Sequence, residues 1–301
     1  MSLSAKAQWN GVGLLVLLAL CWGSFWPVMT LSLAEIPIVP FRILTGLGGS
    51  SLILSVAVWR GQSLRIPRAV FWPLVRLSLI TTTSWLVFSA IGTSILGSGR
   101  AVLIAYTMPL WAFLFSLWML DERPTSARWF GLGAAMTGIV VMVSQDIAAF
   151  TDRPAGILAM FAAAIAMGLG SILIKRRDWG IGNIPLAGWQ TLFGSLPLLP
   201  FYGLQDFNIA AVSWQAWAAT AYVAAIGVCA GVIFYMTALI RLPISMATLG
   251  VLLVPVVGLS LSAVTVERYL GWPEYIALGF ILIGMTTVLP MPSLRTLLRR
   301  Q

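Results

Sequence analysis

The sequence predicts an all-α integral membrane protein with ten transmembrane helices. Apolar residues make up 59% of the 301 residues and charged residues only 9%, a balance that a water-soluble domain does not have. The mean hydropathy is +0.95. A membrane-spanning helix needs about 20 mostly apolar residues, and short charged or turn-rich segments separate runs of about this length. The chain therefore accommodates ten spans joined by short loops.

Each expected span is an apolar run between charged or turn-forming residues. The first begins at Gly11, and it is too long for the apolar core of a signal peptide and lacks a convincing cleavage site, so we expect a permanent span. The third is the least regular, because it contains Pro73, Arg76 and the polar run 81–84. The ten expected spans cover residues 11–32, 38–59, 70–91, 98–120, 127–144, 155–174, 184–202, 214–239, 243–265 and 271–290.

The distribution of Lys and Arg predicts the orientation, since cytoplasmic loops carry an excess of basic residues. With the N-terminus inside, the outer segments hold only Arg153 and Arg268. The opposite side collects Lys6, Arg60, Arg65, Arg68, Arg123, Arg128, Lys175, Arg176, Arg177, Arg241, Arg295, Arg299 and Arg300. Both termini are therefore expected in the cytoplasm. The net charge of +9 is dispersed over these loops, which favours membrane lipid headgroups over nucleic acid as the partner.

The second half of the sequence repeats the first at an offset of 146 residues. The fourth and fifth expected spans match the ninth and tenth: Pro109 falls on Pro255, Asp121 on Glu267, Leu132 on Leu278, Gly133 on Gly279 and Gly138 on Gly284. Five spans per repeat is an odd number, so the second copy must cross the membrane in the opposite sense. Two inverted halves can exchange conformations and open a central site to either side alternately, which is typical of carriers.

Missing residue types disfavour other functions. The chain has no histidine, and Cys21 and Cys229 lie in apolar runs, so we expect no metal site, no disulfide and no cofactor. A phosphate-binding loop is absent, which excludes ATP hydrolysis by this chain. Enzymatic activity is not expected, because the sequence offers neither a Ser–His pair nor two Asp residues in mid-span. A gated channel is a weaker alternative to a carrier, since no ring of like charges or carbonyl filter is recognisable.

Several short motifs occur in a fixed order along the sequence, and the motif that begins with a proline occurs in both halves. They are Trp22-Gly23-Ser24, Pro40-Phe41-Arg42, Pro109 followed by Asp121-Glu122-Arg123, and Pro255 followed by Glu267-Arg268. In their order, spacing and duplication, these motifs resemble the drug/metabolite transporter superfamily in its EamA-type, ten-helix form. The second half departs from this pattern, because it has Gly168 and Gly170 where a Trp-Gly pair is expected.

The resemblance implies two five-helix repeats, residues 1–148 and 149–301, around a central cavity, with the last helix of each repeat at the periphery. The sequence looks most like the aromatic amino acid exporters of bacterial inner (plasma) membranes. It implies export of aromatic and other neutral amino acids, or related metabolites, by alternating access. A broad-specificity drug exporter or a nucleotide-sugar carrier is the alternative. All nine acidic residues lie in loops or at span ends, which favours transport without proton coupling.

An aromatic solute with charged amino and carboxylate groups needs stacking faces and hydrogen-bonding partners near the midplane. Tyr106 is the leading candidate, because it precedes Pro109, which can bend its helix, as Pro255 can in the second half. Residues of suitable chemistry and depth complete the candidate substrate-binding set: Trp22, Ser24, Trp26, Trp85, Ser171, Trp189, Gln190, Tyr222 and Tyr235. Packing or a hydrogen bond between helices is the alternative for each.

Arg42 is a further candidate, since it lies about one turn inside an apolar span. A guanidinium there is costly unless it is paired or hydrated, so it could bind a carboxylate. The alternatives are that it reaches the outer interface or pairs with Glu35. Small-residue patterns such as Ala134-x-x-x-Gly138 indicate close helix packing. Such packing is compatible with a monomer or with a homodimer formed through the fifth or tenth span.

Overall fold

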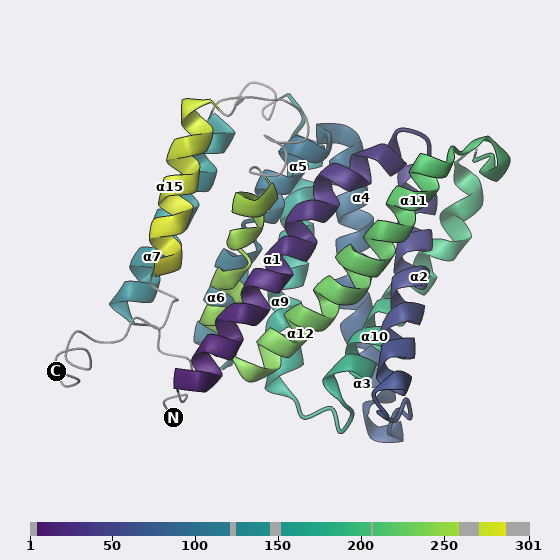
Figure 1. The fold of residues 1–301 in the computed structure, drawn as a ribbon, viewed down its shortest axis with the longest axis horizontal. Coiled ribbons are helices and arrows are strands. Elements are labelled where there is room, and N and C mark those ends of the chain that lie inside the picture. The colour runs from purple at the N-terminus through teal and green to yellow at the C-terminus, as the bar shows by residue number, and fades with distance from the viewer. Residues whose placement is uncertain (1–4, 121–124, 145–151, 206, 259–270, 287–301) are drawn as a thin grey trace.

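The computed structural model describes residues 5–120, 125–144, 152–205, 207–258 and 271–286. All regular secondary structure in these ranges is helical (Figure 1). The predicted all-α class is therefore confirmed.

Ten helical stretches follow one another in the order of the ten expected spans within the described residues. Seven of them are long and apolar enough to cross a membrane. They are α1 (Ala5–Leu33), α2 (Ile38–Trp59), α3 (Arg68–Ser78) continued by η1 (Leu79–Thr83) and α4 (Ser84–Leu96), α5 (Ser98–Ala105) with α6 (Met108–Met119), α7 (Ser126–Ser144), α9 (Pro154–Arg176), and α11 (Trp214–Tyr222) continued by η4 (Val223–Ala230) and α12 (Gly231–Arg241).

The remaining three stretches are shorter or interrupted. Helix α10 (Asn183–Ser195) continues as the 3₁₀ segment η2 (Leu196–Leu204), in which Pro197 and Pro200 each lack the N–H of a regular α-helical bond. A short 3₁₀ turn, η3 (Ile209–Ala211), precedes α11. The last two stretches are α13 (Ile244–Gly250), which resumes at 253–258, and α15 (Trp272–Thr286). Parts of the ninth and tenth expected spans, 259–265 and 287–290, lie outside the described residues.

The third span differs from its expected range of 70–91. It starts at Arg68 and ends only at Leu96, before Gly97, whose φ of +81° lies in the left-handed region that glycine adopts most easily. In its middle, residues Leu79–Thr83, which overlap the polar run 81–84, form a π-helix rather than an α-helix. The irregularity of the sequence there thus corresponds to an unusual helix and not to a break in the span.

The first helices of the two halves run antiparallel. Gly11, near the start of α1, packs against Leu242, where a β-carbon would lie 2.5 Å from the leucine Cδ2. Lys175, near the end of α9, donates a hydrogen bond to the Leu242 carbonyl. Helix α1 therefore begins at the end of the molecule where α9 finishes (Figure 1). This direction agrees with the odd number of spans in each repeat.

Departures from regular α-helix fall at equivalent places in the two halves. The 146-residue offset moves η1 onto 225–229, which lies inside the π-helix η4. The fourth span is interrupted at Tyr106–Thr107 and the ninth at Val251–Leu252, each shortly before a proline, Pro109 or Pro255. At each interruption a backbone N–H donates to the carbonyl three residues earlier, instead of four as in an α-helix. These hydrogen bonds run from Thr107 N to Ile104 O (3.0 Å) and from Val254 N to Val251 O (2.9 Å). Each half thus has one π-helical span and one span interrupted before a proline, and the second half adds the 3₁₀ segment η2 in its second span.

Helices α7 and α15, the last helix of each half, lie side by side at the edge of the bundle (Figure 1). Small residues allow the close approach, because a β-carbon at Gly138 would lie 2.8 Å from the Ala277 carbonyl oxygen. One at Gly284 would lie 2.6 Å from the Gly131 carbonyl oxygen. The small-residue pattern of the fifth span is therefore used for packing within one chain.

The substitution Gly138→Ala is expected to destabilise the protein, because backbone cannot move aside as a flexible side chain can. Overpacking of this kind costs about 1–3 kcal/mol. Gly133 in the same helix is the matched control, since a β-carbon there would meet no atom within 4 Å. Thermal unfolding followed by tryptophan fluorescence in one detergent should show a lower midpoint for Gly138→Ala only. An equal decrease in both variants would contradict the packing explanation.

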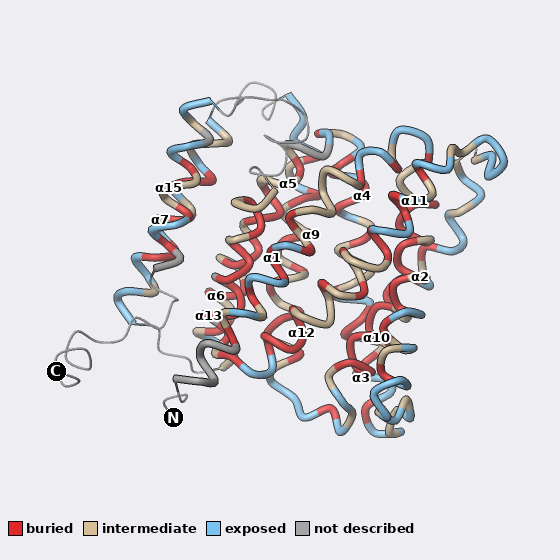
Figure 2. The backbone as a smooth tube through the Cα atoms, viewed as in Figure 1, coloured by how far each residue is buried: buried red, intermediate tan, exposed pale blue. Residues whose placement is uncertain are grey.

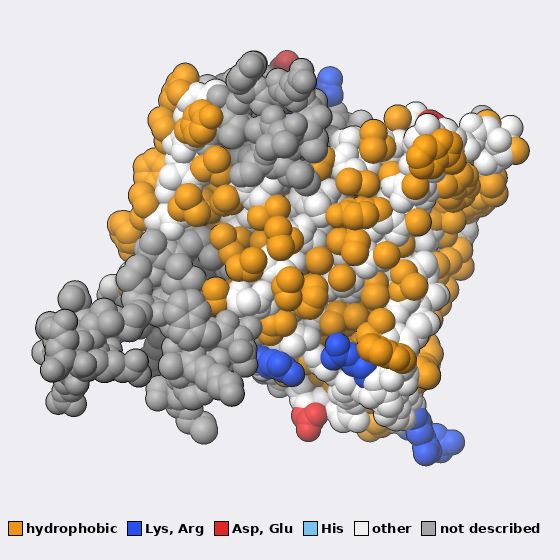
Figure 3. Space-filling model, in the orientation of Figure 1, with side chains coloured by type: hydrophobic (Ala, Val, Ile, Leu, Met, Phe, Trp, Pro, Cys, Tyr) orange, Lys and Arg blue, Asp and Glu red, His pale blue; other side chains and the backbone are white. Residues whose placement is uncertain are grey.

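Burial follows the layout of a lipid-embedded bundle. Buried residues lie along α9, α10 and the inward sides of their neighbours, whereas α7, α15 and the outer turns are largely exposed (Figure 2). Apolar side chains are spread over the described part of the face in Figure 3, and most of its visible Lys and Arg side chains lie at the lower edge. The polar groups that remain inside therefore stand out as candidates for function.

Candidate functional site

A cavity of about 170 Å³ lies between the two halves of the bundle. Its walls combine residues of α1, α2, η1 and α4 with residues of α9, α10, η4 and α12. Eight of the eleven candidates from the sequence line it: Trp22, Trp26, Arg42, Trp85, Tyr106, Ser171, Gln190 and Tyr235. Residues more than 200 positions apart in the chain thus meet around one space.

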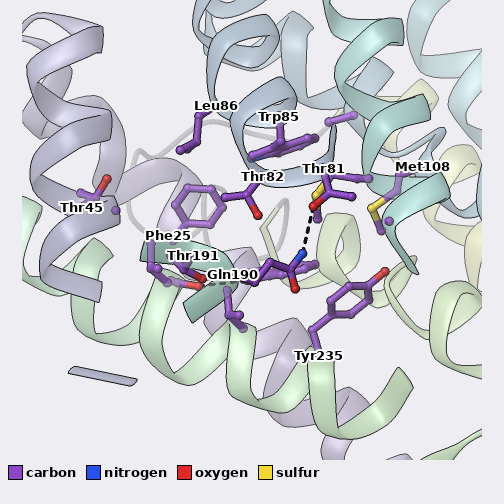
Figure 4. A pocket seen from close by; sticks show the side chains of 18 of the residues that line it. Phe25, Thr45, Thr81, Thr82, Trp85, Leu86, Met108, Gln190, Thr191 and Tyr235 are labelled. Carbon is purple, nitrogen blue, oxygen red and sulfur yellow. Dashed lines mark hydrogen bonds between the residues drawn. The ribbon is translucent and has the colours of Figure 1, made fainter. Parts of the chain in front are cut away.

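One polar pair in the cavity joins α10 to the π-helix η1. The amide nitrogen of Gln190 donates to Thr81 Oγ1 at 2.9 Å, and the Thr81 hydroxyl donates to the Leu77 carbonyl at 2.7 Å. Figure 4 shows Gln190 extending between Thr81 and Tyr235, with Trp85 beyond Thr81. The amide oxygen of Gln190 is buried and has no hydrogen-bond partner among the residues that the structure describes. This oxygen is an acceptor available to a bound molecule.

A second polar group links α9, α12 and α1. The hydroxyls of Ser171 and Tyr235 lie 2.6 Å apart, and the Tyr235 ring lies 5.1 Å from the Trp22 ring at an angle of 41°. Trp22 Nε1 donates to the Gly227 carbonyl at 3.0 Å. Gly227 belongs to η4, so this contact fixes an aromatic wall against a π-helical turn. The polar atoms of Trp22 and Tyr235 are thereby satisfied, and their ring faces remain for packing.

Arg42 supplies a positive charge to the cavity lining. Its side chain is 5% exposed, and Nη2 donates to Ser89 Oγ at 3.2 Å. The Nε atom is buried and has no partner in the described part of the chain. The guanidinium carbon lies 5.9 Å from the centroid of the Phe41 ring. None of the described lining residues is Asp or Glu. The charge therefore has no compensating carboxylate within the lining.

Glu35 has a different partner from the one considered in the sequence. Its two carboxylate oxygens accept hydrogen bonds from the backbone N–H and the hydroxyl of Ser213, both at 2.6 Å. These two bonds, the hydroxyl first, lower the pKa of Glu35, because they favour the charged form. Glu35 lies in the turn after α1 and connects that turn to the start of α11.

Three candidates lie outside the lining. Tyr222, the last residue of α11, donates to Ser24 Oγ at 2.8 Å, so these two residues join α11 to α1. Trp189 donates from Nε1 to the Leu64 carbonyl at 2.9 Å, and its ring stacks on Phe193 at 5.4 Å. Each makes a contact between or beside helices, which was the alternative considered for them.

The lining also contains residues that sequence reasoning did not single out. Thr81 and Thr82 come from the polar run of the third span, whose irregularity was noted without a role. Further unselected lining residues are Phe25, Thr45, Met108, Met167, Thr191 and Ser195. Thr and Ser in apolar helices commonly bond their own backbone, so their sequence carries little signal of where they face.

A bundle of lipid-exposed helices, built from two antiparallel halves around an aromatic cavity with few polar groups, is the architecture of a membrane transporter for small solutes. The chain belongs to the EamA-like transporter family, whose profile matches residues 9–144 and again residues 154–289. The two matches agree with the repeat found in the sequence. The family consists of transporters rather than enzymes.

Curated relatives cover most of the chain. A protein of Streptantibioticus cattleyicolor described as a probable terminal-alkyne amino-acid exporter is 29% identical, over 99% of this chain and 96% of its own length. The uncharacterized transporters YoaV of Bacillus subtilis and sll0355 of Synechocystis are 22% and 25% identical, over 67% and 75% of this chain and 68% and 73% of their own lengths. A solved crystal structure has the same fold, with a TM-score of 0.79 at 21% identity, over 97% of this chain and 98% of the other.

Proposed function

We propose that this protein is a secondary transporter that exports amino acids, aromatic and other neutral ones, from the cytoplasm by alternating access. The observation that carries the proposal is Arg42, a buried cation in the cavity lining with an unused Nε–H. A guanidinium binds a carboxylate with two parallel hydrogen bonds in a fixed geometry. A solute that carries a carboxylate and an aromatic or apolar body matches this lining.

The size of the cavity supports a small solute. A dry protein cavity of about 150 Å³ holds one benzene molecule, and this cavity measures about 170 Å³. Pockets for drug-sized ligands are typically about 300–1,000 Å³. Aromatic amino acids are larger than benzene and need some widening of this cavity, whereas the alternative, a broad-specificity exporter of drugs or other metabolites, needs a much larger space in another conformation.

Alternating access is supported by the matched irregularities of the two halves. Each half has a π-helical segment in its third span, η1 or η4, and an interruption before a proline in its fourth. All four border or enter the cavity lining. Helices bend most readily at π-segments and prolines, so we propose that exchange between these paired bends opens the cavity to one side and then to the other. A gated channel does not need such pairing and is the weaker alternative.

The proposed orientation and location are supported by the distribution of charge. Arg60, Arg65 and Arg68, between α2 and α3, lie at the same end of the bundle as Lys175 and Arg241. By the positive-inside rule this end is cytoplasmic, and both termini belong there in the inner membrane. The amino acid description of the Streptantibioticus relative supports the substrate class.

Uptake into proteoliposomes that contain only this protein tests the proposal. Labelled tyrosine, tryptophan and phenylalanine would be supplied, with unlabelled amino acids and cationic drugs as competitors. We expect saturable uptake, inhibited by aromatic amino acids and accelerated by the same amino acid loaded inside. Uptake of drugs or sugars alone would discard the amino acid assignment, and flux that does not saturate would favour a channel.

Transport is expected to be independent of a pH gradient. A proton-coupled carrier needs a titratable group that faces both sides in turn, and none of the described lining residues is Asp, Glu or His. Collapsing an imposed gradient with an ionophore should therefore leave the initial rate unchanged. The control is the same ionophore added to vesicles on which no pH gradient has been imposed. A rate that follows the gradient would contradict uncoupled export.

A further inference from the structure

We propose that Gln190 is a specificity-determining residue, which selects solutes that carry a hydrogen-bond donor at the end remote from their carboxylate. Tyrosine and tryptophan should therefore be preferred to phenylalanine. The inference rests on the proposed amino acid transport. It adds to it the direction in which the solute lies in the cavity and an order of preference among aromatic amino acids.

The orientation of the Gln190 amide follows from Thr81. The single hydroxyl hydrogen of Thr81 is donated to the Leu77 carbonyl at 2.7 Å, so Thr81 Oγ1 can only accept a bond from Gln190. The amide nitrogen must face Thr81, as its 2.9 Å distance indicates. The amide oxygen is consequently turned away from Thr81, on the side of Tyr235 (Figure 4).

The amide oxygen of Gln190 is an unsatisfied acceptor. The side chain is 8% exposed and lines the cavity, and its oxygen has no partner among the described residues. A buried acceptor is costly to leave unpaired. The neighbouring lining residue Thr191 differs, because its hydroxyl donates to the Ala187 carbonyl of its own helix at 2.9 Å. Gln190 is therefore a polar group of α10 that still requires a donor from the bound solute.

Arg42 and Gln190 lie at different levels of the cavity. Arg42 binds Ser89 and Gln190 binds Thr81, and these two partners are eight residues apart on one span. A rise of 1.5 Å per residue puts them about 12 Å apart along the helix axis. A solute that contacts both residues must therefore do so with groups at its two ends.

An α-amino acid cannot bridge these two levels with its α-groups alone, because the ammonium and the carboxylate share one carbon. With the carboxylate on Arg42, the side chain must reach the level of Gln190. Aromatic faces border that interval, from Trp85 one turn beyond Thr81 to Trp22 and Tyr235. The phenol O–H of tyrosine or the indole N–H of tryptophan can then donate to Gln190, whereas phenylalanine leaves the oxygen unpaired.

Competition for uptake tests the inference with matched pairs of solutes. Tyrosine is compared with 4-fluorophenylalanine, and tryptophan is compared with 1-methyltryptophan. In each pair the second compound lacks the hydrogen-bond donor of the first at nearly the same size. Sites that hydrogen-bond a solute group discriminate strongly against analogues that lack it. We expect half-inhibitory concentrations at least about tenfold lower for the donor-bearing member of each pair, and a ratio within about twofold in Gln190→Met.

Two further variants separate specificity from folding. Gln190→Leu removes the same acceptor with an apolar side chain of another shape, so it should also lose the preference, and it serves if Gln190→Met does not insert. Ser51→Ala, at a hydroxyl of α2 that bonds its own backbone outside the lining, is the control and should keep the wild-type ratio. Equal inhibition by both members of each pair in the wild type, or an unchanged ratio in Gln190→Met, would overturn the inference while amino acid transport stands. If none of these amino acids is taken up saturably, the proposed function itself fails and the inference with it.

Discussion

Arg42→Gln should reduce uptake of aromatic amino acids at least about tenfold, mainly through a higher KM. A hydrogen bond to a charged group contributes about 1.5–3 kcal/mol, and about 1.4 kcal/mol corresponds to a factor of ten in affinity. Because the described cavity lining holds no Asp or Glu, the guanidinium has no internal carboxylate to compensate its charge. The solute carboxylate is the group that we expect to fill this role.

The solute itself provides a readout that a purely structural role of Arg42 would not change. Tyramine lacks the carboxylate of tyrosine, so wild-type protein should favour tyrosine and Arg42→Gln should lose that preference. Arg42→Lys keeps the charge without the planar fork and should restore part of the uptake. Arg60→Gln, at the exposed end of the same helix, is the control. An unchanged tyrosine-to-tyramine ratio in Arg42→Gln would show that Arg42 does not bind the carboxylate.

Much of the cavity lining could be predicted, because polar and aromatic side chains deep in an apolar span must find partners inside the protein. Depth can be estimated from the distance to the nearest charged loop, which points to Trp22, Gln190 and Tyr235, whereas Tyr106 is indicated by the proline that follows it. Helix phase is harder to predict. Trp189 precedes Gln190, yet it faces Leu64 and Phe193 outside the cavity.

The parts that could not be predicted depend on contacts between distant segments. No feature of the sequence Leu79–Thr83 distinguishes a π-helix from an α-helix, and the π-helix turns Thr81 toward Gln190, 109 residues away. The ends of the third span were also misjudged, since the polar run weakened the hydropathy on which span boundaries depend. The repeat, by contrast, was visible because Pro and Gly have backbone roles that few other residues fill.

The glycines of the first helix in each half occupy equivalent places in the structure. A β-carbon at Gly23 of α1 would lie 2.7 Å from the Val257 side chain and 3.0 Å from Gly258 N. One at Gly168 of α9 would lie 2.8 Å from both the Trp111 Cβ and the Ala112 backbone nitrogen. The 146-residue offset moves Trp111 and Ala112 onto Val257 and Gly258. Gly168 thus fills the place of the glycine in Trp22-Gly23, although the second half lacks the tryptophan.

Gly23→Ala and Gly168→Ala should each impair transport strongly, because each first helix crosses the other half just beyond the proline of an interrupted span. A methyl group at either crossing presses on backbone and must separate the helices, at about 1–3 kcal/mol. If the two halves exchange conformations, both crossings must stay close in both states, so equivalent losses of uptake rate are expected. Gly13→Ala in α1 is the control, since a β-carbon there meets no atom within 4 Å. Wild-type uptake and thermal stability in Gly168→Ala would contradict the equivalence of the two crossings, whereas a loss of rate at unchanged stability would assign them to the transport cycle.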